Sequence, residues 1–489
     1  MNVNWKVMVP LFAYLVGIYA LAYYSWNVVS RARQGSGYAF MSEFFLADRQ
    51  LGGFLLAMTL VATYVSAGSF IGGPGTAYVQ GLGWVFLAMA QMPTGYLTLT
   101  LLGKKFAIVA RKVNALSVVD FLRERYRSHV VVVISCLAIV GFVMASMTAQ
   151  WVGAARVMQA AGLTYEGGLA LFAITVLVYV TAGGYRAVAL TDALQGAVML
   201  IGTAAILIGT VVAGGGVSNI VRSMYRANPE LITPFGVKGF LSPPWVCSYW
   251  VLVGLGLAGL PQVAVRAMSY KDSMAMHRAI VIGTPVACFL MLGMHLTGAF
   301  ASAVVPGVKA GDLVIPTVTV KVLPEWIGGV FLAAPLAAIM STVDSMVILV
   351  STTIVKDLYL NYVDPSASSR RVSTLSTVIT ALTGIVVFFA SLKPPALLVW
   401  LNLFALGGLE AVFFWPIVLG LYWKRGNAPG AIASMATGVV TYMLFDKVWK
   451  RPFGTHTIVL PLALALVAFI GVSLVTAPPP EDVVRKFWE

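Results

Sequence analysis

The stretch ATYVSAGSFIGGPG, residues 62–75, lies in the middle and at the end of an apolar segment that spans residues 51–79. A helix needs about 20 apolar residues to cross a bilayer, so this segment is long enough to do so. Its small, hydroxyl-bearing and helix-breaking residues predict an interruption. Because backbone polar groups cannot be left open to lipid, a helix that is interrupted at membrane depth borders a protein cavity. We therefore expect a membrane protein with a binding site at this break.

The composition agrees with the membrane class. Hydrophobic residues make up 59% of the 489 residues and charged residues only 10%, and the mean hydropathy is +0.89. A soluble domain carries about 25% charged residues. The net charge of +14 comes from basic residues in the loops between apolar segments, which indicates membrane topology rather than nucleic-acid binding. No nucleic acid and no obligate protein partner are expected.

Apolar runs and helix breakers predict a single transmembrane domain over residues 1–476, with about thirteen membrane-spanning helices. The expected spans are 7–29, 51–79, 83–103, 130–160, 164–182, 188–214, 246–268, 277–305, 326–360, 372–391, 394–422, 428–446 and 456–476. Residues 477–489 would form a short cytoplasmic tail. Roughly two thirds of the lysines and arginines fall on one side of this arrangement. We therefore expect a multi-pass protein of the cell membrane, with its N-terminus outside and its C-terminus in the cytoplasm.

A second interruption is predicted in the span 246–268, where three glycines and Pro261 precede Gln262. It lies five helices after the first interruption. Breaks at corresponding positions in two halves are typical of inverted-repeat transporters. Residues 51–214 and 246–422 would then be the two repeats, flanked by extra helices at 7–29 and 428–476. The alternative is that membrane helices simply contain more glycine and proline than soluble ones.

The ninth expected span contains the run AAIMSTVDS, residues 337–345. The hydroxyls of Ser341 and Thr342 and the carbonyl of Ala338 can supply three oxygen ligands for a hard cation such as sodium. Two carbonyls from the unwound second helix would complete a set of five. The alternative is that these hydroxyls bond back to their own helix or join it to a neighbour.

Three acidic residues lie within the expected spans, and each suggests a function because intramembrane acids are costly. Asp192 is near the cytoplasmic start of the sixth span, where a helix-start role is the alternative. Asp344 lies deeper, within the ninth span, which favours a role at an ion site. Glu410, in the eleventh, is interpreted as a structural hydrogen-bond hub.

Several motifs in this order resemble those of the sodium:solute symporter family. The family-level motifs are residues 66–75, the run Gly183-Gly184-Tyr185-Arg186 leading to Thr191-Asp192, and residues 337–342. Residues 269–273, 312–317, 354–359 and 407–416 resemble the branch of the family that carries pantothenate. The resemblance covers nearly all of residues 1–476. It implies an all-α fold of the leucine-transporter type, with a core of five plus five helices in inverted repeat.

The resemblance also implies site residues. A sodium site would be made by the carbonyls of Ala62, Val65 and Ala338 and the hydroxyls of Ser341 and Thr342. In some members, a second sodium site uses the acid that matches Asp192. Here the candidate residues for it are Asp192, Asp344 and Ser345, with Ser341 as a shared hydroxyl. Asp344 stands where the family pattern has a neutral residue, and Gln262 stands where close relatives have histidine.

The expected function is sodium-coupled import of a small organic anion, pantothenate, by alternating access. The solute would contact Ser66, Ser69, Gln91 and Gln262, and sodium would be the coupling ion with no other cofactor. The partners are then the solute, sodium and the lipid bilayer. The alternatives are a symporter of the same family for another monocarboxylate, an amino acid or a sugar, and, from other classes, a channel or a membrane-embedded enzyme. An enzyme is not expected, because the chain has no phosphate loop and no nucleophile with a histidine partner.

Overall fold

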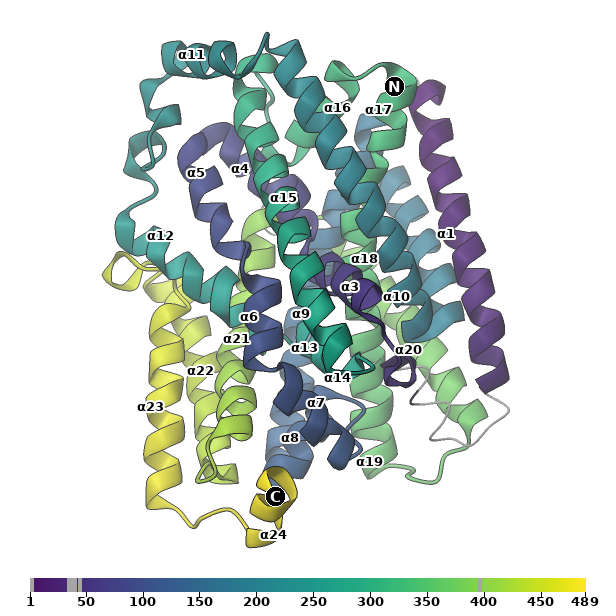
Figure 1. The fold of residues 1–489 in the computed structure, drawn as a ribbon, viewed down its shortest axis with the longest axis vertical. Helices are drawn as coiled ribbons and strands as arrows, with labels where there is room; N and C mark the ends of the chain where they lie inside the picture. Colours follow the sequence, from purple (N-terminus) through teal and green to yellow (C-terminus); the bar gives the residue numbers. More distant parts are fainter. Residues whose placement is uncertain (1–3, 33–41, 43–45, 395–397) are drawn as a thin grey trace.

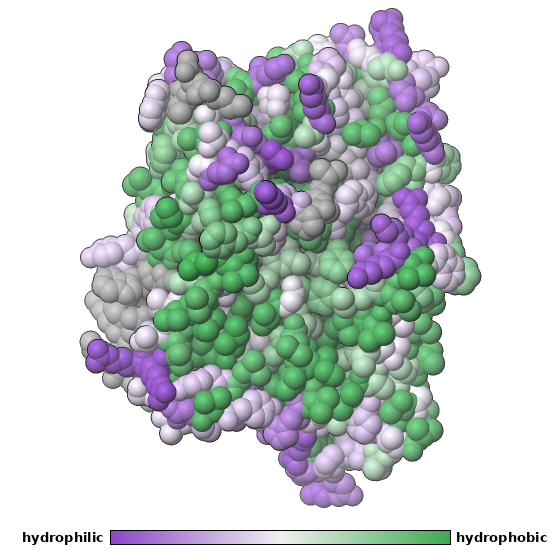
Figure 2. Space-filling view, turned by 180° about the vertical axis from the view of Figure 1, so that it is seen from behind, coloured by the Kyte–Doolittle hydropathy of each residue, from purple (hydrophilic) through white to green (hydrophobic). Residues whose placement is uncertain are grey.

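The computed structural model describes residues 4–32, 42, 46–394 and 398–489. These residues are almost entirely helical, with one isolated backbone bridge between Leu51 and Tyr270. Most of the long helices run along the long axis of the molecule, and the two termini lie at opposite ends of it (Figure 1). Hydrophobic side chains cover the broad middle of the face shown in Figure 2, and most hydrophilic ones lie toward its top and bottom. This distribution fits a protein that crosses a bilayer.

Within the described residues, seven helices are long and apolar enough to cross a membrane. Three bent pairs of helices each pass the same test as one broken span, and three shorter helices are apolar. These groups together equal the thirteen spans expected from the sequence. The number of crossings itself stays a prediction, because length and composition alone do not place a helix in the bilayer.

The first predicted interruption is present, but it starts earlier than the glycine cluster. Helix α3 (Gly53–Tyr64) ends before Val65, whose backbone is extended at φ −75° and ψ 111°. The chain resumes as a π-helical turn, η2 (Gly68–Gly72), and continues as α4 (Gly73–Gln80). The two parts meet at 65°. The glycines therefore lie inside the resumed helix, where they let it approach its neighbours, rather than at the break.

The second interruption also lies where the sequence predicts it. The first part consists of α12 (Pro243–Tyr249), the π-helical turn η6 (Trp250–Leu255) and η7 (Gly256–Gly259). The second part is formed by α13 (Pro261–Ala264) and α14 (Arg266–Ser269), at 55° to the first. Between them Leu260 is extended, as expected for a residue that precedes proline.

The remaining elements connect and enclose the two broken helices. In the first half they are α1 (Trp5–Ala32), η1 (Ala47–Arg49), α5 (Leu82–Ala88), η3 (Met89–Gln91), α6 (Thr94–Leu101), α7 (Gly103–Lys112), α8 (Val118–Tyr126), α9 (His129–Ala160), α10 (Tyr165–Ala213), α11 (Val217–Ala227), η4 (Pro229–Ile232) and η5 (Val237–Gly239). In the second half they are α15 (Ser273–Val304), η8 (Gly311–Leu313), α16 (Val314–Val322), α17 (Glu325–Phe331), α18 (Ala333–Thr352), η9 (Thr353–Tyr359), α19 (Leu360–Tyr362), α20 (Ser369–Leu392), α21 (Leu398–Tyr422), α22 (Ala428–Val448), η10 (Pro452–Gly454), α23 (Val459–Val475) and α24 (Glu481–Trp488).

Two of these elements differ from the sequence expectation. Helix α10 is continuous from Tyr165 to Ala213, whereas the glycine pair at 183–184 predicts two helices, 164–182 and 188–214. Its two apolar stretches are still distinct: Val188–Ala213 is a candidate span, and Tyr165–Val178 is a shorter apolar helix. The segment Leu82–Leu101, which matches the expected third span, is followed by α7 after a bend of 44°. Local breakers therefore mark the ends of apolar stretches more reliably than the ends of helices.

The tail after α23 contains a short helix. Its last residues form α24, which packs on α8 at the lower end of the molecule (Figure 1). Asp482 pairs with Arg127, and Lys486 Nζ lies 2.6 Å from Glu124 Oε2. Phe487 is buried, with its ring centroid 5.8 Å from that of Phe121. The tail is therefore an integral part of this end of the protein.

Helix α18 lies at the centre of the helix bundle and is buried along its whole length. It packs against α3, α9, α10 and α20. Helix α15 packs along both α3 and α4, and so follows the first broken helix across its break. Gly298 of α15 makes this possible, because a Cβ at this position would overlap the backbone carbonyl of Pro74 in α4.

We expect Gly298→Ala to destabilise the protein by about 1–3 kcal/mol, because overpacking here must displace backbone rather than a flexible side chain. Gly141→Ala in α9 is the matched control, since a Cβ there meets no atom within 4 Å. Both changes add the same methyl group and the same helix propensity. The thermal unfolding of detergent-solubilised variants measures the difference, and equal midpoints for the two variants would contradict this packing.

Candidate functional site

The end of α3 presents backbone carbonyls to the interior of the protein. The last carbonyls of a helix have no partner within it, and the helix dipole places partial negative charge there. Because Val65 is extended, the helix cannot continue and satisfy them. The carbonyls of Ala62 and Val65 therefore need other partners, and a cation is one that suits them.

Helix α18 supplies hydroxyls to these carbonyls. Ser341 Oγ lies 2.8 Å from the carbonyl oxygen of Ala62, and Thr342 Oγ1 lies 3.0 Å from that of Val65. The carbonyl oxygen of Ala338 is 3.1 Å from Ser341 Oγ and 3.0 Å from Thr342 Oγ1. The structure thus brings together all five oxygens that the sequence predicts as sodium ligands, and no charged side chain is among them.

The alternative role of these hydroxyls is visible in the same geometry. Both bond back to Ala338 of their own helix and also join α18 to α3. A hydroxyl can donate to a carbonyl and still direct a lone pair at a cation. The arrangement therefore fits a sodium ion bound between α3 and α18. Sodium binding by these five oxygens stays a prediction.

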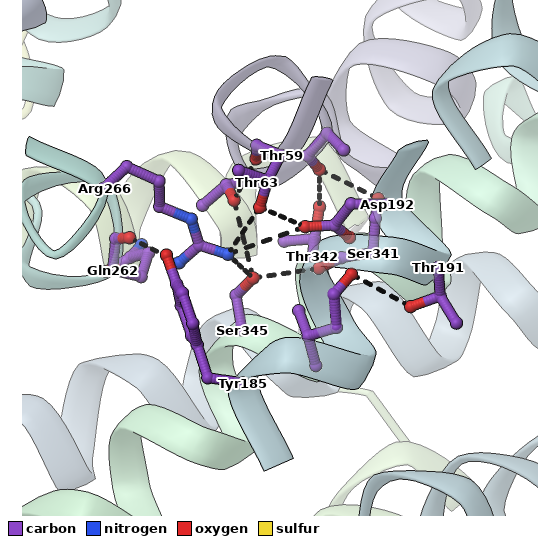
Figure 3. Close-up of polar contacts among 12 residues, drawn as sticks. Thr59, Thr63, Tyr185, Thr191, Asp192, Gln262, Arg266, Ser341, Thr342 and Ser345 are labelled. Carbon is purple, nitrogen blue, oxygen red and sulfur yellow. Dashed lines mark hydrogen bonds and ion pairs between the residues drawn. The ribbon is translucent and has the colours of Figure 1, made fainter. Parts of the chain in front are cut away.

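The candidate second site contains a residue that the sequence analysis missed. Asp192 and Ser345 lie near each other, and the guanidinium of Arg266 contacts both (Figure 3). Arg266 Nη2 is 3.7 Å from Asp192 Oδ2 and 3.4 Å from Thr59 Oγ1. Arg266 is 1% exposed and Asp192 is fully buried. A cationic side chain therefore belongs to this cluster.

The other two intramembrane acids have different surroundings. Asp344 is fully buried on α18 and lies near Tyr14 of α1. Glu410 packs against Gly256 in the second broken helix, and neither of its carboxyl oxygens has a hydrogen-bond partner among the described residues. No hydrogen bond of its carboxyl group among the described residues therefore supports the interpretation of Glu410 as a hydrogen-bond hub.

A narrow cavity lies beside the break in α3. It reaches from Thr342, at the predicted sodium site, to residues of η3, η6, η7, α13, α15 and α21. All four residues predicted to contact the solute line it, and the full lining is Thr63, Tyr64, Ser66, Gly68, Ser69, Gly73, Trp84, Leu87, Ala88, Gln91, Tyr249, Val253, Leu257, Leu260, Gln262, His295, Thr342, Met346, Val399, Asn402, Leu403 and Leu406. The predicted sodium and solute positions thus meet at Thr342, and both use the unwound turn of the first broken helix.

Comparisons with known proteins show the family and the fold of the chain. The profile of the sodium:solute symporter family matches residues 44–438. The chain belongs to the sodium:solute symporter family. Over 467 residues it is 49% identical to the sodium/pantothenate symporter of Escherichia coli (strain K12), which covers 95% of each chain. It is 45% identical over 469 residues to the sodium/pantothenate symporter of Haemophilus influenzae, covering 96% of each.

More distant relatives and solved structures extend the likeness. The osmoregulated proline transporter OpuE of Bacillus subtilis is 27% identical over 491 residues, covering 99% of this chain and 97% of that protein. A sodium-coupled sialic acid symporter, in a substrate-bound outward-open state, superposes with a TM-score of 0.79 at 18% identity, covering 98% of this chain and all of the other. This chain therefore has the leucine-transporter-type fold that its sequence leads us to expect.

Further residues of the symporter support the unwound turn. The side-chain oxygen of Gln150 accepts a hydrogen bond of 2.7 Å from the Ala67 N–H, and Ser66 Oγ accepts one of 3.1 Å from Gly68. Asn402 Oδ1 in turn accepts from Gln150 Nε2 at 3.2 Å. These bonds satisfy N–H groups that the break in α3 leaves without helical partners. The turn is therefore held from α9 and α21.

Sequence reasoning missed several residues of the site for different reasons. Arg266 was detectable, since a basic residue at the end of an apolar span carries the same signal as an acidic one. Gln150, His295 and Asn402 are single polar residues in long apolar helices, and their positions give no local pattern. Trp84 is a further residue that the sequence analysis missed, and its ring lies edge-on to that of Tyr249 beside the cavity, with ring centroids 5.9 Å apart. Only the packing of helices far apart in sequence brings these groups to the break.

We expect Gln150→Leu to lower the thermal stability of the symporter, because it leaves the Ala67 N–H buried without an acceptor, at a cost of about 1–3 kcal/mol. It should also reduce the stabilisation that added sodium gives, since the turn carrying the Val65 carbonyl loses its support. Ser135→Ala is the control on the same helix, because the Ser135 hydroxyl is buried and bonds back to the carbonyl of Val131. Similar unfolding midpoints for the two variants would show that Gln150 does not hold the turn.

Proposed function

We propose that this protein is a sodium-coupled symporter that imports pantothenate by alternating access. The observation that carries the proposal is the convergence of five neutral oxygens, from the break in α3 and from α18, on the edge of a cavity lined by hydroxyl and amide side chains. Near-full-length identity of 45–49% to two sodium/pantothenate symporters supports the choice of solute. The protein is thus a transporter and not an enzyme.

The break in α3 explains how sodium and solute become coupled. Sodium would bind the carbonyls of Ala62 and Val65 and the hydroxyls of α18, and so fix the unwound turn. The same turn carries Ser66 and Ser69 into the cavity. A solute then meets an ordered pocket only when sodium is bound, because ordering the turn in advance lowers the cost of binding. Sodium is the coupling ion, and the proposal needs no further cofactor.

The cavity offers pantothenate neutral polar partners. Ser69 Oγ lies 3.4 Å from Gln91 Oε1, and Gln262 is buried beside them. Among the described lining residues none is lysine or arginine, so the carboxylate would be held by hydroxyl, amide and backbone N–H groups. His295 donates through Nδ1 to the carbonyl of Met291 at 2.7 Å, which leaves Nε2 as an acceptor for a hydroxyl or N–H group of the solute. Hydroxyls and amides also suit the hydroxyl and amide groups in the rest of pantothenate.

The proposed orientation places the N-terminus outside and the C-terminus in the cytoplasm. The two termini lie at opposite ends of the molecule (Figure 1). The end that carries α8 and α24 also carries Arg123, Arg125, Arg127, Arg485 and Lys486. Basic residues are enriched on the cytoplasmic side of membrane proteins. The symporter is accordingly a multi-pass protein of the plasma membrane.

Purified protein in liposomes should accumulate labelled pantothenate when sodium is outside, and not when potassium replaces it. We expect Ser341→Ala with Thr342→Ala to raise the half-saturating sodium concentration by about a hundredfold or more, since two ligands are lost and each costs about 1.5–3 kcal/mol. Thr210→Ala is the control, because the buried Thr210 hydroxyl bonds back to Ile206 of its own helix. Sodium-independent uptake, or unchanged sodium dependence in the double variant, would refute the proposal.

The solute position is tested separately. Gln91→Leu and Ser69→Ala should each raise the KM for pantothenate by about tenfold, because a site that hydrogen-bonds its solute loses roughly 1–3 kcal/mol when one partner is removed. At saturating pantothenate, the half-saturating sodium concentration should change far less. Competition by other monocarboxylates, proline and sugars checks the solute class. If proline competes as well as unlabelled pantothenate does, the solute assignment is wrong while the family remains.

A further inference from the structure

A buried arginine fills the centre of the cluster where a second sodium ion was expected. Arg266 of α14 donates through Nη2 to Ser345 of α18, and the same nitrogen lies 3.7 Å from Asp192 of α10 (Figure 3). Its contact with Thr59 adds α3 to the cluster. Four helices that are separate in sequence therefore meet around one guanidinium.

The guanidinium is fixed in place by its other contacts. Arg266 Nη1 donates to the carbonyl of Gln262 at 2.7 Å. The ring of Tyr185 faces the guanidinium, with 5.1 Å between Arg266 Cζ and the ring centroid. Tyr185 is itself held by Ser269, with 3.2 Å between the two hydroxyl oxygens. The positive charge is thus built into the fold and cannot leave as a bound ion does.

The charges at this cluster indicate the role of Arg266. A buried carboxylate needs a cation close by, because an uncompensated charge in a low-dielectric interior is strongly unfavourable. Arg266 supplies that cation to Asp192 permanently. A sodium ion bound beside the guanidinium would be repelled by it and would compete with it for Asp192 and Ser345. Tyr14 lies near both Asp192 and Asp344, and neither Tyr14 nor Asp344 adds positive charge.

We propose that Arg266 is the resident counter-ion of Asp192 and takes the place of a second sodium ion, so that the symporter couples one sodium to each pantothenate. The inference rests on the proposed function and specifies its stoichiometry. The first sodium site differs in kind, because its five oxygens are neutral and no fixed cation is among them. One sodium with one monovalent anion carries no net charge, so transport is electroneutral.

The steady-state accumulation ratio in proteoliposomes measures this stoichiometry. With a tenfold sodium gradient and no potential, one sodium per solute gives about tenfold accumulation of pantothenate and two give about a hundredfold. An inside-negative potential, set with potassium and valinomycin, should leave the ratio of the wild-type protein unchanged. Near-hundredfold accumulation that rises with the potential would overturn the inference, and absence of sodium-driven accumulation would instead refute the proposed function.

Variants test whether Arg266 sets the stoichiometry. Arg266→Gln leaves Asp192 without its counter-ion, and we expect a second sodium to take that place, so that the Hill coefficient for sodium rises from about one toward two and accumulation becomes voltage-dependent. Arg266→Lys keeps the charge and should stay electroneutral. Asp192→Asn combined with Arg266→Gln removes both charges and should also couple one sodium.

These readouts separate coupling from folding. The accumulation ratio at steady state does not depend on how much of the protein is active, so a purely structural role of Arg266 would lower the uptake rate of every variant and leave the ratio alone. That result in Arg266→Gln would overturn the inference. If Arg266→Gln shows no uptake, sodium binding to the purified variant decides instead, and it is measured as the thermal stabilisation that sodium gives. A second sodium-binding event in Arg266→Gln that is absent from the double variant supports the inference. The absence of a second event in both variants refutes it.

Discussion

The structure depends on one constraint: the carbonyls at the end of α3 lie in the interior of a membrane protein and need partners other than water. Open backbone groups are not tolerated in lipid, so the break must be enclosed by protein. Helix α18 encloses it, which explains why that helix is buried along its length and why its hydroxyls face α3. Helix α15 follows the other side of the break through Gly298. The same carbonyls that require this packing are the ones predicted to bind sodium.

The predicted sodium site and the neighbouring Arg266 cluster differ in the source of their positive charge. Between α3 and α18 the ligands are neutral oxygens, so a sodium ion can bind and be released without leaving an unpaired charge behind. One turn further along α18, Ser345 belongs to a cluster that keeps its own cation, Arg266. Thr63 lies 3.5 Å from Ser345 and so connects α3 to both clusters. Under the two proposals, the transporter would combine an exchangeable sodium ion with a permanent cation, and both would contact α18.

The parts of the site that could be predicted from sequence are those with a local pattern. The break near residues 62–75 follows from composition, and Ser341 and Thr342 are one turn after Ala338 on a single helix. The second break follows from Pro261. Gln150, His295 and Asn402 could not be found in this way, because an isolated polar residue in an apolar helix does not reveal which helix faces it. The contact of Arg266 with Asp192 likewise depends on tertiary packing across 74 positions of sequence.

Errors in the fold prediction have the same origin. The glycine pair at 183–184 suggests the end of a helix, yet α10 continues through it, since a glycine in a helix costs only about 1 kcal/mol, which packing against α1, α18 and other neighbours can offset. Contacts with distant segments therefore outweigh the local preference at this glycine pair.

The position of Trp84 also gives the protein an optical property. Its indole lies in edge contact with both Tyr249 and Trp400, with ring centroids 5.9 Å and 6.3 Å apart, on the wall of the cavity. Indole fluorescence shifts with the polarity of its surroundings, and tyrosine and tryptophan rings at this spacing exchange excitation energy. Any movement that hydrates the cavity or separates these rings changes the contribution of Trp84 to the emission of the twelve tryptophans, and a variant without Trp84 would isolate that contribution.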